Sequence, residues 1–192
     1  SREKEVPAEL KIENLNGTKD PGPLTPQQME SGLKMASMFV AGAPLLFARW
    51  AKGFKKHPNK LPLFDPDVSN AAGGDADIFY YHSYWKLEEQ EALRIRVKPP
   101  ACDNWNFQLN NYWMESLDYR YHTVCMNKAM AHVESDGTVE LVVSARNPGV
   151  KNWLDTCGHS EGTMCWRWYR LEDRKDAVEP DCQVLKLDQF LK

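Results

Sequence analysis

The sequence predicts a mainly β protein, an antiparallel jelly-roll-like β-sandwich with an N-terminal helical segment. From residue 77 onward, about seven short strand patterns follow one another without a helical pattern between them, which is typical of a sandwich or barrel. In one of them, "ALRIRVKPP", apolar and charged residues alternate as on a half-buried strand. An apolar pattern at helical spacing precedes these strands between residues 25 and 54.

The helix is predicted to begin with a capping box. Thr25 suits the N-cap, Pro26 the first helical position and Gln28 the third. Gly42 and Pro44 should kink or break the helix, because proline lacks the N–H group that a helix interior needs.

Composition changes divide the chain into two predicted domains. Residues 1–76 comprise a polar arm, the helical segment and an irregular linker over 57–76 that is dense in Pro, Gly, Asn and Asp. Residues 77–192 form the sandwich. Within it, the strand patterns "TVCMNKAMAHV" and "TVELVVSAR" flank Ser135-Asp136-Gly137, which predicts a hairpin.

Charge and cysteine usage narrow the classes of function. The chain has 192 residues and a formal net charge of -3, which gives no reason to expect a nucleic acid partner. No run is judged long and apolar enough to span a membrane, so no membrane partner is expected. The five cysteines are odd in number and lack CxxC spacing, which indicates free thiols and favours a cytoplasmic location.

A ligand-binding surface is the first functional hypothesis. The strand pattern "WNFQLNNYW" places amides on the face opposite its large apolar rings, and rings with amides are the usual groups for binding a carbohydrate or another small polar molecule. At least half of the rings in this region should nevertheless belong to the core. The predicted ligand-binding residues are Trp105, Asn106, Gln108, Asn110, Trp113 and Tyr119.

An enzyme is the alternative. Two Asp-x-x-x-His pairs occur, and Arg167 could hold an anionic substrate, so the predicted catalytic residues are Asp118, His122, Asp155, His159 and Arg167. Imidazole and carboxylate groups also suit a transition metal, but this spacing is not diagnostic on strands or loops. We therefore assign no metal and no cofactor. A nucleophilic Cys157 activated by His159 is a weaker variant of the same hypothesis.

A structural interpretation competes with both chemical ones. Asp155 and Thr156 could organise their loop through hydrogen bonds from side chain to backbone, and Arg167 could be the buried partner of Asp118 or Asp155. Trp153 is then expected to anchor the loop in the core.

Several ordered motifs resemble a bacterial family known as domain of unknown function twelve-fourteen, which is often found C-terminal to domain twelve-fifty-four. The motifs are Trp105, Ser116-Leu117-Asp118-Tyr119, Asp136-Gly137, Asn152-Trp153-Leu154 and Gly158-His159. The resemblance covers roughly residues 77 to 192 and implies a jelly-roll-like sandwich without implying a chemistry. The chain departs from the family at Asn147-Pro148-Gly149, where Asp-Pro-Gly is common, so no carboxylate function is expected there.

The sequence thus favours a sandwich that binds a small polar ligand or has a structural role in a larger assembly. In the second case the apolar residues of the 25–54 helix would form a homo-oligomer or pack within a longer parent chain. An enzyme would require Asp155, His159 and Arg167 to converge with Ser116 or Asp118 in one pocket.

Overall fold

A computed structural model describes residues 6–15, 17 and 22–190 of the chain. The first residues of the predicted arm, 1–5, and residues 16 and 18–21 lie outside the described part. Contacts divide the chain into two compact units, Ser1–Ala41 and Gly42–Lys192. The end of the helix and the 57–76 linker therefore belong to the same unit as the strands, whereas the sequence places a domain boundary after residue 76. That boundary stays a prediction.

Helix α1, Pro26–Phe54, begins with the capping box that the sequence predicts. The Thr25 backbone N–H donates to Gln28 Oε1 at 2.8 Å, and the Gln28 N–H donates to Thr25 Oγ1 at 3.2 Å. The expected break at Gly42 and Pro44 is wrong, because α1 is continuous with Pro44 inside it. A proline removes one helical hydrogen bond, and the bonds on both sides are enough to continue the helix here.

α1 carries many large apolar side chains that are exposed in the structure. They are Met29, Leu33, Met35, Met38, Phe39, Val40, Leu45, Leu46 and Phe47. An 18-residue window of this helix has a mean hydropathy of 1.4. By length and composition the helix could therefore cross a membrane, so the expectation that no run is long and apolar enough is wrong. Core helices of soluble proteins and signal sequences pass the same test.

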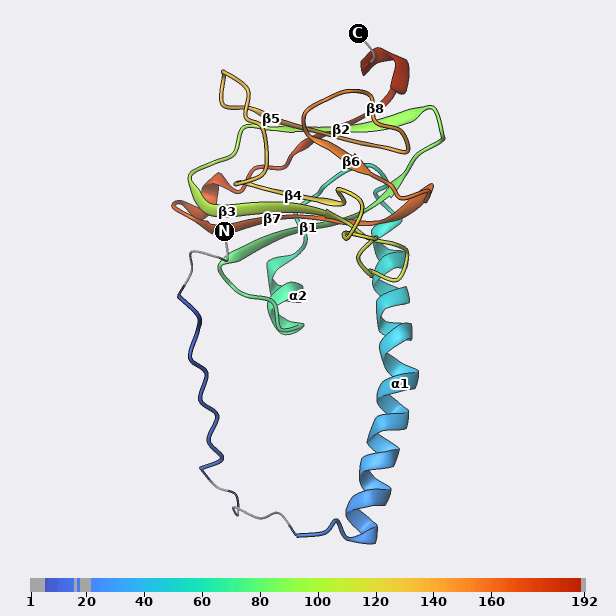
Figure 1. The fold of residues 1–192 in the computed structure, drawn as a ribbon, viewed down its shortest axis with the longest axis vertical. Coiled ribbons are helices and arrows are strands. Elements are labelled where there is room, and N and C mark those ends of the chain that lie inside the picture. The colour runs from blue at the N-terminus through green and yellow to red at the C-terminus, as the bar shows by residue number, and fades with distance from the viewer. Residues whose placement is uncertain (1–5, 16, 18–21, 191–192) are drawn as a thin grey trace. The chain divides into compact units, whose positions relative to one another are not determined.

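The strands form two sheets of four, one above the other in Figure 1. In sheet order, the first contains β1 (Ile78–Lys86), β7 (Glu161–Leu171), β3 (Cys102–Leu109) and β4 (Cys125–Asn127). The second contains β6 (Trp153–Asp155), β5 (Val139–Ser144), β2 (Glu91–Val97) and β8 (Asp181–Lys186). One apolar core joins residues of both sheets, which confirms a mainly β sandwich. It is not antiparallel throughout, because β6 pairs parallel with β5.

The hairpin predicted around Ser135-Asp136-Gly137 is wrong, although a tight turn is present. The Gly137 N–H donates to the carbonyl of Glu134 at 2.9 Å, and Gly137 has a φ of 82° that suits glycine. The flanking strands lie in different sheets, since β4 pairs with β3 while β5 pairs with β2 and β6. Turn residues specify a local reversal of the chain, and they do not specify which strand becomes the neighbour.

Three indole rings occupy the centre of the core. Trp105 of β3 stacks on Trp166 of β7 with centroids 4.7 Å apart, and Trp166 meets Trp168 edge-on at 5.0 Å. All three are buried. Because side chains alternate along β7, the residue between the two tryptophans, Arg167, points to the opposite face of the sheet.

Short helices complete the fold. α2, Pro66–Ala71, lies within the linker that the sequence predicts as irregular, and the Asp65 side chain caps it by accepting from the N–H of Asp67 at 2.9 Å. α2 lies on the outer side of the first sheet (Figure 1). Two 3₁₀ turns, Arg174–Asp176 and Leu187–Phe190, flank β8.

Gly162 should be the position where a single methyl group does most damage to the sandwich. A Cβ there would overlap the carbonyl oxygen of Asn110 and lie 2.9 Å from Trp85 Nε1, which donates to that same carbonyl. We expect Gly162→Ala to lower the free energy of unfolding by about 1 to 3 kcal/mol through overpacking. Gly53→Ala is the matched control, since no atom beyond the adjacent helix backbone and chain neighbours lies within 4 Å of the added Cβ, and alanine favours a helix by up to about 1 kcal/mol. Urea unfolding measures the free energy of unfolding of both variants. An unchanged midpoint for Gly162→Ala would contradict the packing described.

Candidate functional site

A cleft of about 270 Å³ lies on the outer face of the first sheet. Its wall comes from the end of α1, from α2 and the residues around it, and from strands β1 and β7. The lining residues are Trp50, Phe54, Phe64, Val68, Ser69, Ala72, Gly73, Gly74, Tyr80, His82 and Arg167, all of which belong to the unit Gly42–Lys192. A second cleft of about 360 Å³ shares Trp50, Phe54, Phe64 and His82 with it.

The floor of the cleft follows from strand alternation. On β1, Tyr81 and Phe79 are buried in the core, so Tyr80 and His82 face outward. β7 pairs with β1 in a register that places Arg167 opposite Tyr80. At the rim, the chain returns from α2 through Gly74, whose N–H donates to the carbonyl of Ser69 at 2.9 Å. A Cβ at Gly74 would overlap the Ser69 side chain, so glycine is required for this close approach.

Aromatic rings surround His82. Its imidazole stacks on Phe54 with centroids 5.2 Å apart and on Tyr80 at 5.6 Å, while Phe64 meets it edge-on at 5.4 Å. Burial, and secondly the positive charge of Arg167, lowers the pKa of His82 from 6.5 to about 4. The imidazole is therefore neutral near pH 7, and the cleft contains a neutral aromatic wall beside one fixed cation.

Arg167 is half-buried and has few partners of its own. One terminal nitrogen donates to Asn106 Oδ1 at 3.3 Å, and the guanidinium carbon lies 5.9 Å from the centroid of the Tyr80 ring. Asn106 in turn donates from Nδ2 to the Tyr169 hydroxyl at 3.1 Å, which fixes the amide orientation. Within residues 6–15, 17 and 22–190, no carboxylate forms an ion pair with Arg167. Most of its five N–H donors are thus available to an anion.

Of the predicted ligand-binding residues, Asn106 contacts Arg167 of the cleft without lining the cleft itself. Trp105 is 2% exposed and stacked on Trp166, so it has no free face for a ligand. Gln108 donates to Asn110 Oδ1 at 2.7 Å, and Asn110 is buried where β3 ends. One donor of the Gln108 amide is therefore used by Asn110.

The two remaining predicted rings lie in the segment between β3 and β4. Trp113 is 50% exposed and packs edge-on against Tyr112, and Tyr119 is 70% exposed. Neither lines the cleft around Arg167. The predicted surface is therefore divided, with one amide at the cleft and two rings elsewhere on the domain.

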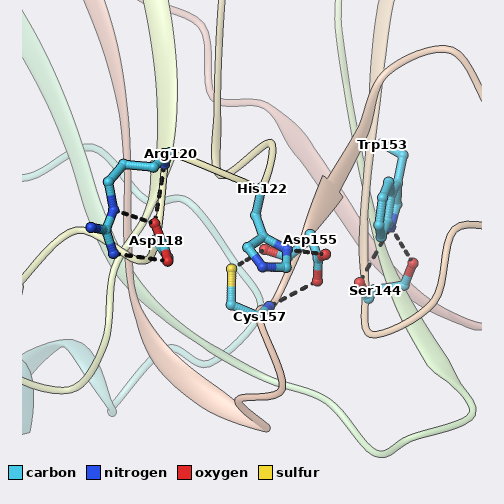
Figure 2. A network of polar contacts seen from close by, with 7 residues as sticks. All are labelled: Asp118, Arg120, His122, Ser144, Trp153, Asp155 and Cys157. Carbon is cyan, nitrogen blue, oxygen red and sulfur yellow. Dashed lines mark hydrogen bonds and ion pairs between the residues drawn. The ribbon is translucent and has the colours of Figure 1, made fainter.

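The predicted catalytic residues do not converge, although two of them meet. His122 Nδ1 lies 2.8 Å from Asp155 Oδ2, and Figure 2 shows the imidazole directed toward that carboxylate. His159 lines a separate cleft with Glu88 and Thr156. Arg167 contacts neither Asp118 nor Asp155 among the described contacts, so it is not the buried partner of either. The convergence that an enzyme with this residue set requires is absent from the described residues.

The Asp118 carboxylate forms an ion pair with Arg120. Arg120 Nε lies 3.1 Å from its Oδ1, and this hydrogen-bonded guanidinium holds the pKa of the Asp118 carboxyl below its usual range (Figure 2). Ser116 donates to the carbonyl of Leu117. Neither side chain forms a hydrogen bond with the side chain of His122 or Asp155 among the described contacts.

Cys157 joins that pair instead of pairing with His159. Donor atoms of His122, Asp155 and Cys157 all lie within 4.8 Å of one another. The Cys157 N–H donates to Asp155 Oδ1 at 2.8 Å, which bears out a role for Asp155 in organising its loop. Burial, and secondly the Asp155 charge, raises the pKa of the Cys157 thiol, so the thiol is protonated near pH 7.

Trp153 does not anchor the loop in the core, which corrects the expectation from the sequence. It is half-buried and donates from Nε1 to Ser144 Oγ at 2.9 Å (Figure 2). The core residue of β6 is Leu154, whose side chain points the other way along this short strand.

Sequence reasoning missed most of the cleft. Trp50, Phe54 and Phe64 precede the strands and come together with Tyr80 and His82 only through the return of the chain over the first sheet. The one local signal was the alternation of Tyr80, His82 and Tyr84 on a single face of the "DIFYYHSYW" pattern. The sequence places Cys157 near His159, whereas the structure brings its thiol close to His122, which is far away in the chain.

Comparisons with known proteins support the fold without indicating an activity. No protein-family model matches the sequence, and no curated protein matches it. The chain is similar to an uncharacterized protein from Burkholderia cenocepacia of known crystal structure, with 47% sequence identity and a TM-score of 0.91. The match covers 98% of this chain and 52% of that one, so this chain spans about half the length of the Burkholderia protein. A weaker likeness, to a Vibrio parahaemolyticus protein, has 16% identity and a TM-score of 0.47.

His82 should make the domain less stable in acid. Its folded pKa of about 4 lies below the ordinary value of 6.5, so between these pH values the unfolded chain binds the extra proton. The free energy of unfolding should therefore fall as the pH decreases from 6.5 to 4, by roughly 2 to 3 kcal/mol from this residue alone. Urea unfolding of the wild type and His82→Gln at pH 7 and pH 4.5 isolates the effect. Parallel pH dependence in the two proteins would contradict a buried neutral imidazole.

Proposed function

We propose that the sandwich binds a small polar ligand in the cleft around Arg167, with an anionic group of the ligand on the guanidinium. The observation that supports this most is the half-buried cation of Arg167, which has an amide neighbour and no carboxylate partner among the described residues. A partly desolvated charge without a counter-ion is unfavourable, and a bidentate carboxylate or phosphate would compensate it.

The walls of the cleft specify the rest of the ligand. Phe64 and Tyr80 offer ring faces or edges beside the largely buried Phe54, and neutral His82 adds no second charge. A ligand that suits this arrangement has an apolar or ring-shaped body and a single acidic group. A sugar acid combines both properties and extends the carbohydrate hypothesis, because sugar rings stack on aromatic side chains. The jelly-roll-like connectivity remains a further proposal, supported by sheet neighbours that are distant in sequence, such as β1 and β7.

A pair of matched sugars tests the charge requirement. Galacturonate and galactose share a ring and differ in the carboxylate, and saturation-transfer NMR detects weak binding of either. We expect galacturonate to bind the wild type more tightly than galactose does. Arg167→Gln should weaken the acid by about 10- to 100-fold, since a hydrogen bond to a charged group contributes about 1.5 to 3 kcal/mol.

Arg94→Gln is the control for this experiment. Arg94 is also half-buried and also bonds an amide oxygen, that of Gln183 at 2.6 Å, but it lies on the second sheet. Binding of galacturonate should be unchanged in this variant. Three outcomes would count against the proposal. The two sugars could bind equally, both arginine variants could lose affinity equally, or galacturonate could fail to bind the wild type.

A structural role in a larger assembly is the second candidate, and the surface of α1 favours it. Leu33, Phe39 and Val40 are among nine large apolar side chains that α1 leaves exposed. We propose that they pack on a polypeptide equivalent to the other half of the Burkholderia protein. The match covers 98% of this chain but 52% of the Burkholderia protein, so nearly half of that protein lies outside the match.

The second candidate predicts binding to a separately produced polypeptide. We expect the chain to co-elute in size-exclusion chromatography with the unmatched half of the Burkholderia cenocepacia protein, and Phe39→Glu to abolish co-elution by placing a charge in an apolar contact. Ser31→Glu, which adds the same charge at a polar position of α1, should leave co-elution intact. Elution as a self-associated species, or flotation with phosphatidylcholine vesicles without co-elution, would assign the surface to a second copy or to lipid and overturn this candidate.

A further inference from the structure

The segment before β4 and the turn after β6 bring a thiol, an imidazole and a carboxylate together. His122 ends a turn in which its N–H donates to the carbonyl of Asp118 at 3.2 Å. Asp155 is the last residue of β6, and its N–H donates to the carbonyl of Thr123 at 2.8 Å, which ties the two segments together beside the imidazole. Cys157 follows two residues later. The three donor groups therefore meet through the tertiary structure, supported by main-chain hydrogen bonds.

The backbone at Cys157 has an unusual conformation for a cysteine. Cys157 and Gly158 have φ values of 52° and 77°, and the His159 N–H donates to the carbonyl of Thr156 at 3.0 Å. A turn with two positive φ values favours Asn, Asp or Gly at its first central position, and another residue there costs about 1 kcal/mol or more. Backbone conformations of this cost are more frequent at functional sites than elsewhere. Here the turn keeps the thiol beside Asp155 and His122.

We propose that His122, Asp155 and Cys157 form a binding site for a zinc-like divalent metal ion. Thiolate and imidazole are ligands for borderline metals such as Zn²⁺ and Co²⁺, whereas Mg²⁺ and Ca²⁺ prefer all-oxygen sites. Three protein ligands leave the fourth tetrahedral position to water or to another small molecule. The site shares no residue with the cleft around Arg167, so it is independent of the proposed ligand binding.

Small movements suffice to form the complex. In a tetrahedral zinc site with ligand bonds of about 2.0 to 2.3 Å, donor atoms lie roughly 3.3 to 3.6 Å apart. The imidazole and carboxylate are now 2.8 Å apart and must separate slightly, while the most distant pair must approach from at most 4.8 Å. The His122 side chain is 40% exposed and can rotate toward the ion. On binding, the thiol proton of Cys157 leaves to solvent and a bond from sulfur to the metal forms, with no change in oxidation state.

Titration of the purified chain with Co²⁺ provides the test, because a thiolate bound to cobalt gives a charge-transfer absorption that oxygen and nitrogen ligands do not give. We expect the wild type to bind one Co²⁺ with this band, and Zn²⁺ to remove it by displacement. Cys157→Ser should lose the band. His122→Gln should lose at least about 100-fold in affinity, since removal of an outer-sphere partner of a metal ligand already costs about 10- to 100-fold.

Two matched variants separate this site from incidental binding. His132→Gln changes a histidine of similar exposure, 38% against 40%, that contacts Lys151 and Glu134, and Cys125→Ser changes a half-buried thiol on β4. Both should bind Co²⁺ like the wild type. The proposal is wrong if the wild type shows no charge-transfer band. It is also wrong if the band survives Cys157→Ser and the affinity survives His122→Gln.

Alkylation keeps the proposal testable in the wild-type protein, even if a variant fails to fold. Iodoacetamide labelling, followed by mass spectrometry of the peptides, reports each cysteine separately. Zn²⁺ should slow the labelling of Cys157 at least tenfold and leave Cys125 unchanged. Equal labelling of Cys157 with and without Zn²⁺ contradicts the site.

Discussion

The alternation of side chains along β7 is the constraint on which both the core and the cleft depend. β7 lies between β1 and β3 and pairs with both, so its register positions the whole first sheet. Trp166 and Trp168 point inward and are buried, while Arg167 between them points outward. A shift of one residue would place the guanidinium in the core and the indoles outside, which fixes the register strongly. The same register positions Tyr80 and Asn106 beside Arg167.

The two proposed sites differ in the charge that each would accept. At the cleft, a cation without a carboxylate partner lies beside a neutral imidazole and aromatic rings, which favours an anion attached to an apolar body. At the cluster of His122, Asp155 and Cys157, the groups are electron-pair donors, which favours a cation. The residues that the predicted enzyme would need are divided between these places and the separate cleft of His159.

Helix α1 connects the two compact units and has a different character along its length. Its last turns contribute Trp50 and Phe54 to the cleft, and Ala51 and Phe54 are buried there. Nearer its start, large apolar side chains remain exposed. A helix that is apolar around most of its circumference is stable in water only when another surface covers it. The first part of α1 is therefore the surface that the proposed assembly would cover.

Local physics explains what the sequence by itself determined. Strand alternation, the capping box of Thr25 and Gln28 and the tight turn before β5 all depend on residues close together in the chain, and all were predicted. The partners of strands and side chains depend on contacts between distant residues, which no local pattern encodes. The tertiary structure therefore decided that β4 and β5 lie in different sheets and that β6 runs parallel to β5. The tertiary structure likewise decided that Cys157 lies near His122 and that aromatic side chains line the cleft around Arg167. Several arrangements are locally equivalent, and the packing energy between segments far apart in the chain selects one of them.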